Sequence, residues 1–261
     1  WGKETAHTKS YIKELNQQKE TLDGAKLQTK ELNLKNVEEQ LEAFKFEQKE
    51  HIIMRDYCDK VGIDFASTAL TEEDVDFLAS LDVSFLKIAS QDLNHPEFIK
   101  YVANKNLPTI LSTGLGDLAE IEKAVNCFKP KYINNLILLH CISLYPPKDN
   151  DIHLNQMNTL KNIFELPVGY SDHSVGTAIP LASVALGAQV IEKHFTLDKS
   201  MPGWDHYVSA TPDELKEICD GSKRIVKSLG KKFHDLNERE IKKKDSFRRS
   251  IVTIKAMKKG E

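Results

Sequence analysis

Residues 167–206 read PVGYSDHSVGTAIPLASVALGAQVIEKHFTLDKSMPGWDH, and this stretch decides the fold. Two short apolar runs within it, 167–171 and 190–195, are typical of buried strands, and each ends in a polar cluster. The small residues between the two runs fit a helix, so the order predicts a βαβ unit with parallel strands. The carboxyl ends of such strands form the functional edge of α/β sheets. We therefore expect His173 and His194, which lie at these two ends, to face each other across a metal or substrate site.

Four more strand candidates precede this unit at intervals of about 20–30 residues, and a helix pattern follows each one. They are residues 63–68, 85–90, 108–113 and 136–141. Nearly every strand ends in polar residues, whereas a doubly wound open sheet would concentrate them at one switch point. We therefore predict an α/β fold of the TIM (β/α)8 type. Because six strands are found and a closed barrel needs eight, we expect the barrel to be incomplete at its N-terminal strand or strands.

The composition limits the class of protein. The 261 residues carry a formal net charge of −3, which gives no global field to attract nucleic acid or a membrane surface. No apolar run approaches the roughly 20 residues that span a bilayer. The four cysteines form no CxxC pair or other ligand spacing, so reduced thiols are expected. We expect a cytoplasmic protein that binds neither membrane nor nucleic acid.

Lys87 lies inside an apolar strand, where a buried ammonium group is costly unless it is paired. One interpretation is an anion or carbonyl partner inside the barrel, with Ser90 on the same side near the strand end. The other is a lysine at the strand margin whose amine reaches solvent. A Schiff-base role is open chemically to both Lys87 and Lys193.

Hydroxyl groups gather at the strand ends, and such groups, with backbone N–H groups and a lysine, suit a phosphate or carboxylate ligand. The hydroxyl residues are Ser67, Thr68, Ser90, Ser112, Thr113 and Ser171. Each could instead be a helix cap. His173 and His194 could bind a divalent metal, and Asp205 could add a carboxylate, which leaves positions open for substrate. Asp172 and Glu192 alternate with these histidines and could orient the imidazoles.

Several motifs together resemble the sialic acid synthase family. In order they are FLKIAS (85–90), ILSTG (110–114), LLHC (138–141), VGYSDH (168–173), VALGA (184–188), VIEKHF (190–195), PGWDH (202–206) and RRSIV (248–252). Their order and spacing match over roughly residues 50–261. The resemblance implies a TIM barrel that condenses phosphoenolpyruvate with an N-acetylated hexosamine, such as N-acetylmannosamine or a 2,4-diacetamido relative. The product is a nine-carbon 2-keto sugar acid such as sialic acid, and phosphate is released.

The resemblance also implies roles for individual residues. His173 and His194 would hold Mn²⁺ or Mg²⁺, which polarises the sugar aldehyde, and Asp205 would lie near the metal and sugar. The residues that match the family's phosphoenolpyruvate contacts are Thr68, Lys87, Ser90, Ser143, Tyr145 and Ser171. Members of the family are commonly homodimers, so a homodimer is expected. No Schiff base is needed for this chemistry.

The two ends depart from the family. Residues 1–60 form a charged segment in which 25–29 resemble the second barrel strand; Lys26 is then a phosphate-binding lysine, unless the segment is a helix or loop. We expect residues 61–235 to form the catalytic barrel, and 236–261 read as a linker toward a C-terminal antifreeze-like domain that is not in the sequence. The family's first strand, with its catalytic Glu, is not found. A non-catalytic barrel that binds sugar or phosphate is therefore the alternative.

Overall fold

A five-stranded parallel sheet forms the centre of the computed structural model, which describes residues 46–231, 233 and 235–260. The strands follow the chain in the order β1-β2-β3-β4-β5, and each pairs with the next. Their bounds are β1 Leu86–Ile88, β2 Thr109–Ser112, β3 Leu136–Cys141, β4 Val168–Asp172 and β5 Ile191–Lys193. This order has no reversal and so no switch point, which separates it from a doubly wound sheet.

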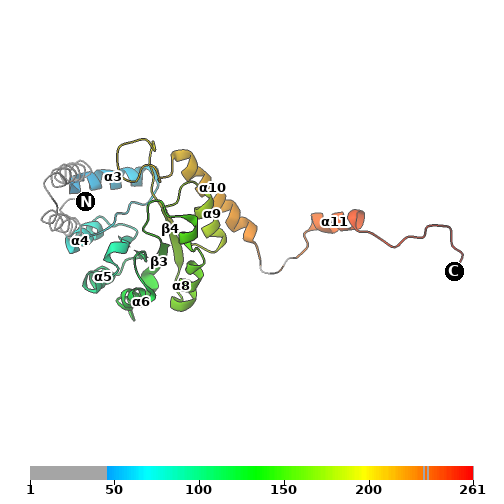
Figure 1. The fold of residues 1–261 in the computed structure, drawn as a ribbon, viewed down its shortest axis with the longest axis horizontal. Coiled ribbons are helices and arrows are strands. Elements are labelled where there is room, and N and C mark those ends of the chain that lie inside the picture. The colour runs from blue at the N-terminus through cyan, green and yellow to red at the C-terminus, as the bar shows by residue number, and fades with distance from the viewer. Residues whose placement is uncertain (1–45, 232, 234, 261) are drawn as a thin grey trace, which may run out of the picture.

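Helices follow the strands and lie in an arc around them (Figure 1). Their bounds are α3 Gln48–Val61, α4 Glu72–Ser80, α5 Pro96–Ala103, α6 Leu118–Asn126, α7 Asp149–Ile152, α8 Gln156–Phe164, α9 Ala178–Ala185, α10 Pro212–Leu229 and α11 Glu238–Phe247. Helix α8 packs on β3 and β4, and α9 packs on β4 and α10. The described chain is thus an α/β half-barrel, and its sheet edge carries the loops that build the site.

Local sequence explains where these elements begin and end. Thr71, Asp117 and Thr211 each form a capping box, so their side chains satisfy N–H groups that have no partner within the helix. Gly62 ends α3 in the left-handed conformation at φ 77°, as expected for a C-cap glycine. The strands β1, β2 and β4 are buried along their whole length, which explains their continuous apolar character.

The predicted strand at residues 63–68 is wrong as a full strand. Among the described residues it contributes one isolated bridge, between Thr68 and Lys87, and the Ala69 N–H donates to the Lys87 carbonyl. Asp64 instead accepts a hydrogen bond from the Ser84 hydroxyl at 2.5 Å, so a side-chain contact replaces the ladder there. The sheet of the described residues therefore has five strands, not the six that were counted, and is not a closed barrel.

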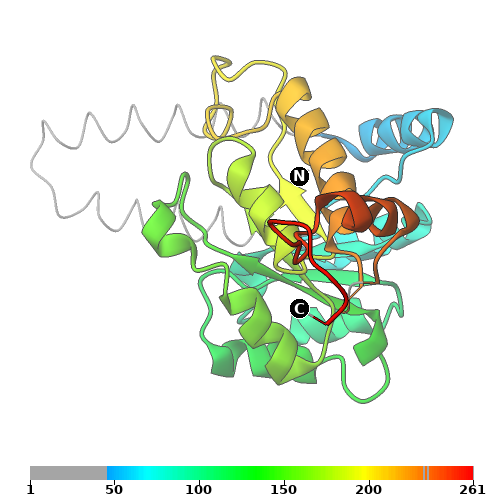
Figure 2. The ribbon, with the colours of Figure 1, turned by 90° about the vertical axis from the view of Figure 1, so that its right-hand side faces the viewer.

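The predicted second strand at residues 25–29, with Lys26, lies outside the described residues. Helix α11 lies within the predicted linker and stands apart from the sheet in Figure 1, whereas in the end-on view of Figure 2 it overlaps the sheet in projection. No helix in the described ranges is long and apolar enough to cross a membrane.

Candidate functional site

Two histidines meet at the carboxyl edge of the sheet. The ring centroids of His173, after β4, and His194, after β5, lie 5.3 Å apart at an interplanar angle of 69°. The Tyr145 ring lies beside both, with centroids 4.0 Å from His173 and 5.6 Å from His194. Asp205 completes the group, because its Oδ2 lies 3.6 Å from His194 Nδ1. The structure therefore brings together the predicted histidines, Tyr145 and Asp205.

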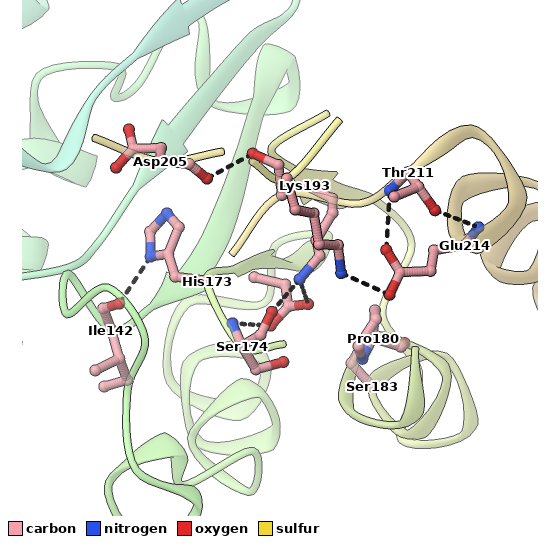
Figure 3. A network of polar contacts seen from close by, with 12 residues as sticks. Ile142, His173, Ser174, Pro180, Ser183, Lys193, Asp205, Thr211 and Glu214 are labelled. Carbon is pink, nitrogen blue, oxygen red and sulfur yellow. Dashed lines mark hydrogen bonds and ion pairs between the residues drawn. The ribbon is translucent and has the colours of Figure 1, made fainter. Parts of the chain in front are cut away.

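The His173 ring is held in one tautomer by its backbone partner. Its Nδ1 lies 2.8 Å from the Ile142 carbonyl oxygen, so Nδ1–H donates and Nε2 keeps its lone pair (Figure 3). This is the arrangement that usually accompanies metal ligation by histidine. Two neighbouring imidazoles suit a divalent first-row metal. However, nowhere in the described ranges do three or more His, Cys, Asp or Glu side chains stand ready to hold an ion.

Burial and charge shift the titration of this group. Burial lowers the pKa of His194, although the Asp205 carboxylate partly offsets it. Burial also acts to lower the pKa of His173, but contacts with the Cys141 thiol and the Ile142 carbonyl raise it on balance. Burial, followed by nearby negative charge, raises the pKa of Tyr145 to about 12. Tyr145 therefore stays a protonated hydrogen-bond donor over the physiological range.

A second cluster lies around Lys87, whose amine is buried and does not reach along the strand margin to solvent. Its Nζ donates to the Ser112 hydroxyl at 2.8 Å and to the Ile88 carbonyl at 2.9 Å, and it lies 3.4 Å from Glu192 Oε2. The other Glu192 oxygen accepts from the Ser171 hydroxyl at 2.6 Å. Side chains from β1, β2, β4 and β5 thus converge, and the predicted Lys87 and Ser171 share one partner.

Gly114 explains how the remaining hydroxyls approach each other. Its N–H donates to the Ser90 hydroxyl at 3.0 Å. A Cβ at this position would collide with the Ser143 hydroxyl and would lie 2.8 Å from the Ser90 hydroxyl and 3.1 Å from Cys141 Sγ. Only a glycine leaves room for the three loops to meet here. Ser90 and Ser143, predicted from different strands, therefore lie in one cluster.

Thr68 lies at the margin of this arrangement. Its bridge to Lys87 places the two backbones side by side, but it lines a cavity of about 570 Å³ between α3 and α4. Ser67 lines the same cavity, whereas none of the other residues that match the phosphoenolpyruvate contacts does so. The phosphate-binding role of Thr68 therefore stays a prediction, with its backbone beside that of Lys87 and its side chain at a different cavity.

Glu192 and Cys141 take part in the site in ways that the sequence did not predict. The Cys141 thiol contacts His173. Glu192 was expected to orient an imidazole, but its carboxylate binds Lys87 and Ser171. The alternation of side chains along β5 predicted that Glu192 and Lys193 point to opposite faces of the sheet. It did not predict which residue each of them contacts. Asp172 likewise binds Lys193, at 2.7 Å, and no imidazole. That ion pair occupies the Lys193 amine, which argues against a Schiff-base role for it.

Comparison with known proteins identifies the family. The NeuB family model matches residues 7–234. Two similar relatives are N,N'-diacetyllegionaminic acid synthases: that of Legionella pneumophila is 40% identical over 85% of this chain and 64% of its own length, and that of Campylobacter jejuni is 44% identical over 78% of this chain and 62% of its own length. The chain thus spans a little under two thirds of these relatives.

Solved structures show the same kinship. The sialic acid synthetase of Leptospira borgpetersenii, in complex with citrate, superposes with a TM-score of 0.72 at 39% identity, over 79% of this chain and 73% of that one. A truncated 3-deoxy-D-arabino-heptulosonate 7-phosphate synthase from Thermotoga maritima shares the fold, with a TM-score of 0.64 at 18% identity over 72% of this chain and 74% of that one. The resemblance drawn from the strand-end motifs is confirmed, and the chain belongs to the NeuB family.

Proposed function

We propose that this chain carries the catalytic barrel of a synthase that condenses phosphoenolpyruvate with an N-acetylated hexosamine. The sugar would be N-acetylmannosamine or a 2,4-diacetamido analogue, and the product a nine-carbon 2-keto sugar acid. The observation that carries the proposal is that two groups of hydroxyls gather at the strand ends that also carry the His173–His194 pair. Lys87 is linked to Ser112 directly and to Ser171 through Glu192, and Ser90 and Ser143 meet at Gly114. In the proposal the Lys87 side of the site binds the anion and the histidine side holds the metal.

The Lys87 cluster has the chemistry of a phosphate or carboxylate site. Its ammonium is desolvated, so its attraction for an anionic ligand is stronger than in water. The hydroxyls of Ser90, Ser143 and Ser171 can each donate a hydrogen bond to a phosphate or carboxylate oxygen. Glu192 balances the Lys87 charge when no substrate is bound, and an incoming anion competes with it for the same ammonium. These groups bind and orient phosphoenolpyruvate in the proposal.

The histidine pair supports the other half of the reaction. His173 and His194 would hold Mn²⁺ or Mg²⁺, and such an ion would polarise the open-chain sugar aldehyde. Asp205 lies beside His194 and faces the same space, where its carboxylate can accept hydrogen bonds from sugar hydroxyls. Tyr145, as a protonated phenol, lies against the His173 ring and limits how far that ring can turn. We also propose a TIM (β/α)8-type barrel, a homodimer and a cytoplasmic location, as the family resemblance implies.

Turnover tests the proposal directly. The protein is incubated with phosphoenolpyruvate, Mn²⁺ and a panel of acetamido hexosamines, and both inorganic phosphate and the condensed sugar acid are measured. We expect phosphate release with at least one sugar. Phosphate release with none of them would favour the alternative, a non-catalytic barrel that binds sugar or phosphate.

A matched pair of histidine variants tests the site. His194→Ala should abolish metal-dependent turnover, because one of two imidazoles is lost. The exposed His95, at the N-terminus of α5, offers the control: His95→Ala should keep wild-type activity. Equal activity in both variants would remove His194 from the site.

A further inference from the structure

A buried ion pair joins β4 and β5 directly behind the two histidines. Asp172 and Lys193 are register partners, and Lys193 Nζ lies 2.7 Å from Asp172 Oδ2. The side chains are 3% exposed for Lys193 and 0% for Asp172, so the pair is shielded from water. The neighbouring register pair, Ser171 and Glu192, points to the opposite face, where Glu192 accepts from the Ser171 hydroxyl and pairs with Lys87. The same two strands therefore carry two consecutive register pairs. The first is Ser171–Glu192, and the second is the buried ion pair Asp172–Lys193, which we call the ionic rung.

The ionic rung also closes a turn around His173. The Ser174 N–H donates to Asp172 Oδ1 at 2.9 Å, and Lys193 Nζ donates to the Ser174 carbonyl (Figure 3). The residues on both sides of His173 are thus bound to one carboxylate and one ammonium group. Such a side-chain turn fixes the backbone conformation of the residue that it encloses.

We infer that the Asp172–Lys193 pair is a positioning device that sets the His173 and His194 imidazoles relative to each other. His173 follows Asp172 and His194 follows Lys193, so one interaction fixes the backbone from which both rings project. The pair touches neither ring, and its role is positioning, not catalysis. The inference rests on the proposed function in one respect, namely that the two imidazoles hold a metal.

The test replaces the pair by uncharged side chains of similar size. Asp172→Asn with Lys193→Met removes the ionic contact, while the amide oxygen introduced by the first substitution can still accept the Ser174 N–H. The control is the Lys199–Glu214 pair, which also has a 2.7 Å contact but lies outside this rung and is 30% and 25% exposed. Lys199→Met with Glu214→Gln therefore removes a lysine–carboxylate ion pair of the same length without changing Asp172, Lys193 or the two histidines. If the Asp172/Lys193 double variant does not fold, Asp172→Asn alone serves.

Two measurements test the inference: the first reports on both rings together, and the second on His173. The first is Mn²⁺ affinity, from the loss of the free-ion signal in electron paramagnetic resonance. The second needs no metal: it is the solvent exchange of the His173 Nδ1–H, which the Ile142 carbonyl holds, observed by ¹⁵N nuclear magnetic resonance. We expect the Asp172/Lys193 variant to bind Mn²⁺ about 10- to 100-fold more weakly and to exchange the imidazole proton faster. The control variant should match the wild type in both.

A double-mutant cycle separates positioning from a general loss of stability. If the pair acts as one unit, the two single variants and the double variant weaken Mn²⁺ binding by similar factors, not by factors that multiply. Unchanged imidazole exchange in the Asp172/Lys193 variant, or an equal change in the control, would overturn the inference. A wild-type protein that binds no Mn²⁺ would instead count against the proposed metal site, and the exchange measurement alone would then decide the positioning role.

Discussion

At the scale of single residues, Lys87 decides whether the strand ends form an anion site. Replacing it with Met removes the ammonium and leaves the Glu192 carboxylate without its ion-pair partner. We expect kcat/KM for phosphoenolpyruvate to fall about 100-fold or more, with most of the loss in KM if the lysine contributes equally to substrate and transition state. Lys216→Met is the control, since Lys216 is an exposed residue of α10 that forms an ion pair with Asp220 on the same helix. An unchanged KM for phosphoenolpyruvate would mean that the anion binds at another place than Lys87.

His140 gives a pH prediction at the same scale. The ring is buried, its Nε2 lies 2.7 Å from the Ile152 carbonyl oxygen, and burial lowers its pKa below the ordinary value of 6.5. The unfolded chain therefore binds a proton more readily, so His140 contributes full stability above about pH 6.5 and loses it as the pH falls further. In His140→Gln, which keeps a donor for Ile152, the melting temperature should drop less between pH 7.5 and 5.5. A parallel drop in both proteins would contradict this.

At the scale of elements, Gly169 shows how tightly β4 packs against its neighbours. A Cβ there would collide with the Val190 carbonyl oxygen, which is backbone, and would lie 2.6 Å from Leu139 Cδ2. We expect Gly169→Ala to lower the free energy of unfolding by about 1–3 kcal/mol. In Gly221→Ala, on α10, the new Cβ would meet only the flexible end of Leu181. Urea unfolding compares the two, and equal stabilities would refute the packing argument.

Sequence patterns predicted the elements better than the contacts between them. Residues 136–141 were predicted with the bounds that β3 has, because a continuous apolar run is a local signal. The pairing of Lys87 with Glu192 joins β1 to β5 and depends on how the sheet curves, which no local pattern contains. Similarly, Asp172 was expected near an imidazole because alternation gives the face of a side chain but not its partner. Which residues lie at the strand ends was therefore easier to predict than the contacts that each one makes.

At the scale of the whole molecule, α11 and the residues after it lie apart from the sheet. The helix carries no buried residue where its side chains are described, and Figure 1 shows it far from β1–β5. We expect removal of residues 236–261 to change the melting temperature by less than about 2 °C, because little apolar surface is lost from the core. Differential scanning calorimetry measures this. A large fall would mean that the segment packs on the half-barrel in solution.

The strictly sequential strand order has a consequence for how the protein is made. Each strand from β2 to β5 pairs with the strand that precedes it in the chain, and the helices between the strands lie in an arc around the sheet. A ribosome releases the chain from its amino end at about 5–20 residues per second. When each of the strands β2 to β5 leaves the ribosome, the strand with which it pairs has therefore already been released. The half-barrel can be assembled one βα unit at a time while translation continues.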